Sequence, residues 1–229
     1  MREGKISFDA VLFDLDGTLV DSVEDIAASA NDVRAHMGLP PLLSQTIQTY
    51  IGDGVQALLE QVLRTQEISI VDQAITLWTS HYLKHCLDHT GLYPGIKEML
   101  QGLCVSQIPM GVVTNKPTKP SEVILKGLGI LNLFQVVIGG DKTSKRKPDP
   151  EPLQFAMECM KIHSEHVLVI GDSPNDVLGA KNANLISCGV LWGIGPQKAL
   201  RAAQPNYLVN IPHDVLQIVN LSFPPSNKT

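Results

Sequence analysis

The sequence lacks an excess of positive charge, and it lacks any long apolar run. Its 229 residues contain 18 Lys and Arg against 23 Asp and Glu, which gives a formal net charge of -5. General nucleic-acid binding needs a positive surface that displaces counterions from phosphates, so we expect no nucleic-acid partner. A membrane helix needs about 20 consecutive apolar residues. No segment of the sequence approaches that length, and we expect no membrane partner either.

Cysteine is scarce and shows no pairing pattern. The four cysteines lie far apart, without a Cys-x-x-Cys pair: Cys86, Cys104, Cys159 and Cys188. This spacing predicts small buried hydrophobic residues in a reducing compartment. The sequence begins Met-Arg-Glu-Gly-Lys, and Asp14 and Asp16 break the apolar stretch that follows, which is unlike a signal peptide. We therefore expect a cytoplasmic protein.

Apolar residues make up 44% of the chain and gather in short runs. The runs are Phe8–Asp14, Ile108–Thr114, Gln135–Gly139, His166–Asp172 and Ile186–Trp192. Near-continuous apolar runs indicate strands covered on both faces, as in a parallel sheet. Helical patterns that open with proline lie between them: Pro117–Leu128, Pro150–Met160 and Pro174–Ala183. The alternation predicts an α/β fold with a doubly wound, Rossmann-like parallel sheet.

One long stretch breaks this alternation. Between Thr18 and Tyr93 no run reads as a strand, and the patterns are helical: Val23–Met37, Val55–Arg64 and Val71–Leu87. The simplest interpretation is a helical insertion after the first strand. We therefore predict an α/β catalytic core of residues 1–18 and 91–229, with residues 19–90 forming an inserted helical cap.

Polar side chains stand where three of the predicted strands end. Asp14, Thr114 and Asp172 occupy these ends, and ligands of parallel sheets bind at the carboxyl ends of strands. Asp16 lies two residues after Asp14, so both carboxylates can project the same way. Two carboxylates this close repel each other unless a cation or a shared proton relieves them. The strand ends therefore predict a charged site.

Asp172 and Asp176 allow two interpretations. Asp172 could cap the helix that begins near Pro174, and Asp176 could be a first-turn acid that favours the helix dipole. Alternatively, they join Asp14 and Asp16 in a cluster of oxygen ligands without histidine or thiol partners, which suits Mg²⁺. We favour the magnesium site.

A phosphoryl group bound beside such a metal needs a hydroxyl donor and a fixed positive charge. Thr114 and Lys147 supply these two groups.

Four motifs in order carry a resemblance to a known family. They are DLDGT at Asp14–Thr18, VVTN at Val112–Asn115, KPDP at Lys147–Pro150 and GDSPND at Gly171–Asp176. The chain resembles the haloacid dehalogenase superfamily over essentially its whole length, and most closely its phosphatase branch. Further segments resemble bacterial phosphoglycolate phosphatases: Tyr50–Leu63, Tyr93–Gly95 and Val137–Asp141.

The resemblance implies a role for each acid. Asp14 would attack phosphorus and form an aspartyl-phosphate. Asp16 would protonate the leaving alkoxide and then take a proton from water. Mg²⁺ would bind the Asp14 carboxylate, the Asp16 main-chain carbonyl and the Asp172 carboxylate. Asp176 would act from the outer shell or through water.

The resemblance also implies residues that bind substrate. Thr114 and Lys147 would hold the transferring phosphoryl oxygens, and Asn115 would orient the phosphate. The inserted cap would exclude water and select the leaving group.

The loop Gly52-Asp53-Gly54 opens one cap helix and carries no cation. Its free N–H groups could receive a small carboxylate such as that of glycolate, which makes Gly52 and Gly54 candidate substrate-binding residues. The alternative is that the two glycines form a turn and Asp53 caps the helix. The sequence favours neither.

We expect a small phosphorylated partner, most closely 2-phosphoglycolate. A sugar-acid phosphate, a nucleotide or a pyrophosphate stays an alternative, as does the activity of a β-phosphoglucomutase-like phosphomutase. A phosphomutase uses the same catalytic residues and differs in whether water or a sugar hydroxyl reaches the aspartyl-phosphate. The sequence does not indicate the oligomeric state.

Overall fold

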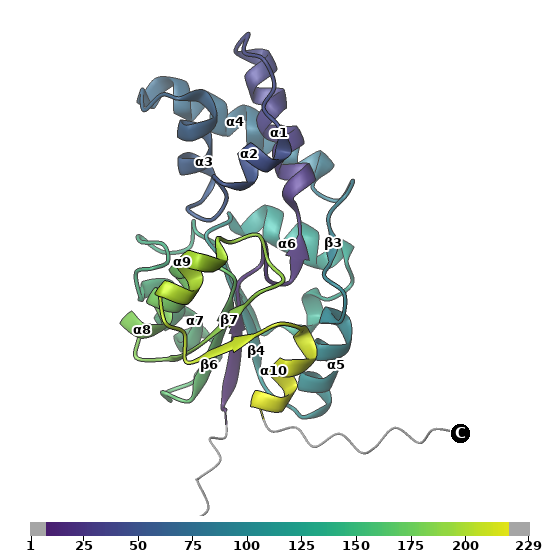
Figure 1. Cartoon of the computed structure of the whole chain (residues 1–229), viewed down its shortest axis with the longest axis vertical. Helices are drawn as coiled ribbons and strands as arrows, with labels where there is room; N and C mark the ends of the chain where they lie inside the picture. Colours follow the sequence, from purple (N-terminus) through teal and green to yellow (C-terminus); the bar gives the residue numbers. More distant parts are fainter. Residues whose placement is uncertain (1–7, 220–229) are drawn as a thin grey trace, which may run out of the picture.

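A parallel sheet with helices on both faces lies beneath a separate group of helices (Figure 1). The computed structural model describes residues 8–219. The six parallel strands have the order β5-β4-β1-β6-β7-β8. They are β1 (Ala10–Phe13), β4 (Met110–Val113), β5 (Val136–Ile138), β6 (Val167–Gly171), β7 (Ile186–Val190) and β8 (Tyr207–Val209). The predicted doubly wound α/β fold is confirmed.

The central strand β1 shows why the apolar runs are continuous. Ala10 and Leu12 pack into one hydrophobic cluster, and Val11 and Phe13 pack into the other. Successive side chains of a strand point to opposite faces, so a sheet covered on both faces needs apolar residues at every position. Helices α7 (Glu151–Met160) and α8 (Pro174–Asn182) contribute to the first cluster. Helices α5 (Ile96–Val105), α6 (Thr118–Gly127) and α10 (Pro212–Ile218) contribute to the second, which also extends into helices that lie beyond the sheet.

Four helices follow the first strand and lie beyond the carboxyl ends of the sheet (Figure 1). They are α1 (Val23–His36), α2 (Ser44–Gln48), α3 (Val55–Leu63) and α4 (Ile68–His85). Helix α1 packs against α2, α3 and α4, and α3 packs against α4. Their buried residues include Leu59, Trp78 and Tyr82, which belong to the same hydrophobic cluster as Phe13 of β1, so apolar packing continues from this group onto one face of the sheet.

The two chain segments that lead into and out of this helical group lie side by side. Strands β2 (Val20–Asp21) and β3 (Gly91–Leu92) pair antiparallel, so the expectation of no strand between Thr18 and Tyr93 was wrong. Each strand has two residues, too few to leave an apolar run in the sequence.

The buried Asp25 carboxylate fastens these segments. It accepts hydrogen bonds from the backbone N–H groups of His89 and Thr90 at 2.8–3.1 Å and from the Thr90 hydroxyl at 2.7 Å. Burial raises the pKa of Asp25, but these hydrogen bonds outweigh it and lower the pKa below its usual value.

The remaining elements are short. They are the 3-10 helix η1 (Leu131–Leu133) and helix α9 (Gln197–Ala202). Cys86 and Cys188 are buried as expected, but Cys104 and Cys159 are exposed, which corrects the prediction that all four are buried. They sit on the outer faces of α5 and α7, where a small thiol needs no apolar partner. Within residues 8–219, no helix combines the length and the hydropathy that crossing a bilayer requires.

Candidate active site

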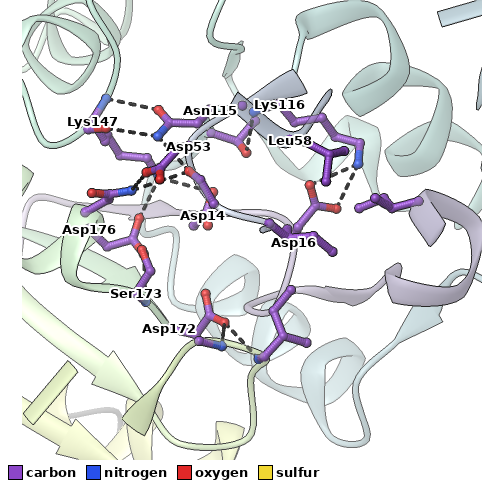
Figure 2. Close-up of a pocket in the computed structure, with 18 of the residues that line it drawn as sticks. Asp14, Asp16, Asp53, Leu58, Asn115, Lys116, Lys147, Asp172, Ser173 and Asp176 are labelled. Carbon is purple, nitrogen blue, oxygen red and sulfur yellow. Dashed lines mark hydrogen bonds and ion pairs between the residues drawn. The ribbon is translucent and has the colours of Figure 1, made fainter. Parts of the chain in front are cut away.

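The sheet order places three polar residues at one point. Strand β1 lies between β4 and β6, and the order of the chain reverses there, which is where doubly wound sheets bind ligands. Asp14, Thr114 and Asp172 follow these three strands directly. They line a cavity of about 290 Å³ that Leu58 and Trp78 of the helical group line as well. Figure 2 shows the side chains that surround it.

Lys147 is the buried cation on one side of this cavity. Its Nζ lies 3.1 Å from Oδ1 of Asp14 and 2.6 Å from Oδ1 of Asp176, and it donates to the Val113 carbonyl at 2.6 Å. Burial lowers the pKa of Lys147, but the two carboxylates outweigh it and raise the pKa above its usual value. The ammonium therefore keeps its charge beside Asp14.

The Asp14 carboxylate is poorly satisfied by the protein. Its Oδ1 is buried and lies within ion-pair distance of Lys147, but it accepts no hydrogen bond from residues 8–219. Burial raises the pKa of Asp14 to about 6, against the opposing charge of Lys147. A buried carboxylate oxygen whose polar neighbour is a single ammonium group keeps room for a further cationic or electrophilic partner.

Backbone N–H groups of the loop after β7 bind the Asp172 carboxylate. Its Oδ2 accepts hydrogen bonds from the N–H groups of Ile194 at 2.9 Å and Gly195 at 2.8 Å. Burial, followed by the charges of Asp14 and Asp176, raises the pKa of Asp172 to about 8. The three carboxylates oppose each other's ionisation, and a bound divalent cation would relieve this repulsion.

The residues present fit a magnesium ion. Asp14, Asp172 and Asp176 each offer a carboxylate oxygen, and these atoms lie within 4.8 Å of one another. Carboxylate oxygens are the ligands that Mg²⁺ prefers. Oδ1 of Asp176 accepts a hydrogen bond from the Lys147 ammonium, and Oδ2 accepts from the Ser173 N–H at 3.1 Å and hydroxyl at 2.7 Å. These bonds suit the outer-shell role expected of Asp176.

The alternative that Asp172 caps the helix is wrong. Helix α8 has Ser173 as its N-cap residue, and Asp172 precedes it. The expectation that Asp176 is a first-turn acid is confirmed: Asp176 lies in the first turn of α8, and its carboxylate accepts the Ser173 N–H.

Asp16 lies apart from the other acids and pairs with Lys116. The Lys116 Nζ lies 2.9 Å from both carboxylate oxygens of Asp16, and Ser22 donates its hydroxyl to Oδ1 at 2.5 Å. Figure 2 shows this pair on the opposite side of Asp14 from Lys147. The Asp16 side chain is therefore outside the carboxylate cluster. The predicted metal contact of its main-chain carbonyl stays a prediction.

Thr114 and Asn115 differ in how free their side chains are. The Thr114 hydroxyl lines the cavity and accepts only the Lys116 N–H, at 3.3 Å, among the described residues. The Asn115 amide donates to the carbonyls of Gly52 and Lys147, both at 2.9 Å, and accepts the Lys147 N–H at 3.0 Å. Asn115 thus connects Lys147 with the Gly52-Asp53-Gly54 loop. Its predicted contact with substrate stays a prediction.

The loop Gly52-Asp53-Gly54 rests on the core through side chains of Asn115 and Asn175. The Asp53 carboxylate accepts the Asn175 amide at 2.7 Å, and helix α3 has Gly54 as its N-cap with no side-chain cap. The alternative that Asp53 caps this helix is wrong. Gly54 has a φ of 91°, and a Cβ there would come within 3.1 Å of the Asn115 carbonyl. Glycine lets the two parts approach this closely.

Several functional neighbours escaped the sequence analysis. Lys116 and Ser22, which hold Asp16, and the Gly193–Gly195 loop, which holds Asp172, were not singled out. Gly193 has no space for a Cβ, which would overlap the Gly17 carbonyl and the Asp172 side chain. The available signals were the lysine directly after VVTN and the Gly-x-Gly that follows the fifth apolar run.

Comparisons with known proteins agree with these motifs. The family model described as haloacid dehalogenase-like hydrolase matches residues 11–190. The phosphoglycolate phosphatase of Chromobacterium violaceum is 34% identical over 84% of this chain and 89% of its own length. That of Neisseria meningitidis is 35% identical over 87% of this chain and 88% of its own length.

A solved structure is similar over the same span. The crystal structure of a predicted phosphoglycolate phosphatase from Haemophilus somnus aligns with a TM-score of 0.87 and 29% identity, covering 94% of this chain and 99% of that protein. The predicted resemblance to the haloacid dehalogenase superfamily and to bacterial phosphoglycolate phosphatases is thereby confirmed. The chain belongs to the haloacid dehalogenase-like hydrolase family.

Proposed function

We propose that this enzyme hydrolyses phosphomonoesters with Mg²⁺ through a phosphorylated Asp14, and that 2-phosphoglycolate is its substrate. The observation that carries the proposal is the environment of Asp14. Its Oδ1 is buried, lies 3.1 Å from the Lys147 ammonium and accepts no hydrogen bond within residues 8–219. The substrate assignment draws on the relatives, which are named phosphoglycolate phosphatase.

Each polar side chain of the cavity has a separate role in this proposed reaction. Asp14 attacks phosphorus, while the Lys147 ammonium and the Thr114 hydroxyl bind the transferring phosphoryl oxygens. Asp16, which Lys116 and Ser22 hold, donates a proton to the ester oxygen and later accepts one from the attacking water.

We assign the metal to Asp14 and Asp172, with the main-chain carbonyl of Asp16 as a further ligand. Asp176 supports the site from the outer shell through Lys147 and Ser173. Bound Mg²⁺ supplies positive charge that offsets the phosphoryl oxygens and the acids around them.

We propose further that residues 19–90 act as a cap over the core of residues 1–18 and 91–229. The cavity between them is closed on one side by Leu58 and Trp78. Closure excludes water other than the attacking molecule and brings leaving-group contacts to the site.

Removal of divalent cations is expected to abolish phosphate release. Asp14, Asp172 and Asp176 crowd their carboxylates within 4.8 Å of one another, and without a cation this charge repels a phosphate dianion. Adding Mg²⁺ after chelation should restore the rate. Ca²⁺ should restore little, because it prefers more ligands and looser geometry. Phosphate release is measured after EDTA treatment and titration with each ion. Full activity in excess chelator would contradict the metal assignment.

A panel of cellular phosphomonoesters tests the substrate. We expect 2-phosphoglycolate to give the highest kcat/KM, because the cavity of about 290 Å³ is just below the usual range of ligand-site volumes, roughly 300–1,000 Å³. Hexose phosphates, nucleotides and pyrophosphate should fall well below it. The panel is read by phosphate release, with β-glucose 1-phosphate also tested for conversion to the 6-phosphate. A clear preference for a sugar phosphate would overturn the substrate but leave the mechanism in place.

A further inference from the structure

Among the described residues, two lysines line the active-site cavity, Lys147 and Lys116. The proposed reaction assigns a part of the substrate to Lys147 but none to Lys116. Lys147 stands beside Asp14 and Asp176 and serves the phosphoryl group. Lys116 lines the same cavity and is 6% exposed. In Figure 2 the two ammonium groups lie on opposite sides of Asp14. A phosphoryl group on Asp14 would therefore have Lys147 on one side and Lys116 on the side of Asp16, the proton donor to the leaving group.

Lys116 has capacity for an acceptor beyond Asp16. An ammonium group has three N–H donors, and the acceptors of Lys116 among residues 8–219 are the two Asp16 oxygens, both at 2.9 Å. Its third neighbour is the face of the Tyr82 ring, 4.5 Å from Nζ to the centroid, which accepts no conventional hydrogen bond. The ammonium is thus fixed in place by α4 and by Asp16 while a donor stays available.

A second donor without a partner lies on the cap side of the cavity. Trp78 is 2% exposed, lines the cavity, and its indole Nε1 has no hydrogen-bond partner within residues 8–219. The ring stacks on Tyr82 with centroids 4.4 Å apart, and Tyr82 lies under Lys116. Buried N–H groups without partners are rare in folded proteins, so the indole of this cavity-lining residue is a candidate donor to a ligand.

We propose that Lys116 and Trp78 form the subsite for a carboxylate on the leaving group. The proposal rests on the proposed phosphatase activity and names the residues that select its substrate class, a small monoester with a carboxylate next to the ester carbon. The carboxylate accepts from the Lys116 ammonium and the Trp78 indole N–H, and Asp16 reaches the neighbouring ester oxygen.

This subsite replaces the cap loop as the place for the carboxylate. That loop already carries the Asp53 carboxylate, which accepts the Asn175 amide. A second carboxylate there would meet like charge, whereas Lys116 offers the opposite charge.

The test compares two esters that differ in the carboxylate alone. 2-Phosphoglycolate and 2-hydroxyethyl phosphate both release an alkoxide, so defects in Asp14, Asp16 or the metal cancel in the ratio of their kcat/KM values. We expect Lys116→Met to lower this ratio by about 10- to 100-fold, the effect of losing a charge-assisted hydrogen bond. Trp78→Phe, which keeps an aromatic ring, should lower it by about 3- to 10-fold. The exposed Lys119 provides the control, and Lys119→Met should leave the ratio unchanged.

A binding measurement separates this proposal from the catalytic one. In an Asp14→Asn background with Mg²⁺ present, calorimetry should show 2-phosphoglycolate binding more tightly than 2-hydroxyethyl phosphate. Lys116→Met in that background should remove the difference. If Lys116→Met depresses both esters equally in turnover and leaves the binding difference intact, Lys116 acts only through Asp16 and the subsite is wrong. If the wild-type protein hydrolyses neither ester but binds them with the expected difference, the subsite stands and the proposed function falls.

Discussion

Phosphate release is expected to fall to background, by at least about 10⁴-fold, when Asp14 is replaced by Asn. The carboxamide keeps the size of the side chain but has no anionic oxygen that can attack phosphorus. The side chain is 13% exposed and lies 3.1 Å from the Lys147 ammonium, and the proposed mechanism gives no other residue the role of nucleophile. Phosphate release with 2-phosphoglycolate gives the rate. Mass spectrometry of protein quenched in acid during turnover shows whether the phosphorylated form is lost with it.

The fold of this variant should survive. Burial raises the pKa of Asp14 to about 6 from the model-compound value of 3.8. Since the folded pKa is the higher one, folding favours the protonated form, and the ionised carboxylate opposes folding as the pH rises from about 4. A neutral Asn should therefore not lower the melting temperature at neutral pH. Asp9→Asn, at an exposed position before the same strand, is the matched control and should keep full activity. Substantial turnover by Asp14→Asn would overturn the phosphorylated-aspartate mechanism.

The parallel sheet was predictable because its strands have a simple sequence pattern. Strands such as β1 and β6 are buried at every position, so their sequences are unbroken apolar runs that end on an acid. The runs extended one or two residues beyond the observed strands at each end, except that the run for β7 begins at the first residue of the strand, Ile186. The polar residues at those ends could be predicted to lie together, because the carboxyl ends of parallel strands meet at one edge of the sheet.

The shortest strands have no comparable pattern in the sequence. The strands β2 and β3 have two residues each, and their pairing joins positions about 70 residues apart, from Val20 to Leu92. Strand β8 lies at the edge of the sheet and is only three residues long. Such pairings depend on the tertiary structure, and periodicity within a short window does not contain them.

The site shows the same division between strand ends and loops. Asp14, Thr114 and Asp172 follow strands, and the structure brings them to one cavity as expected. Lys116 reaches Asp16 across 100 positions of sequence, and Gly195 reaches Asp172 from a different loop. A hydrogen bond between loops depends on where the fold brings them, so the sequence motif identified the acids without identifying the groups that hold them.

The second large effect is expected at Lys147. Replacing it with Met keeps the length and apolar stem but removes the ammonium that lies between Asp14 and Asp176. Transition-state charge on the phosphoryl oxygens then loses its fixed cation, and we expect kcat to fall by about 10³-fold. Breaking a buried ion pair by removing one partner costs about 3–5 kcal/mol, so the free energy of unfolding without added metal should fall by about 3 kcal/mol. Urea titration and phosphate release measure the two effects.

Lys145→Met is the matched control in the same loop. Its side chain is 66% exposed and its nearest acid, Asp149, lies 3.5 Å away on the surface, so removing it should change stability by about 0.5 kcal/mol or less. Activity should stay at the wild-type level. If Lys147→Met loses activity but keeps full stability, the two acids around it tolerate one another without the cation, and the ammonium acts on substrate alone. If it keeps activity, Lys147 does not bind the phosphoryl group, and the assignment of this lysine is wrong.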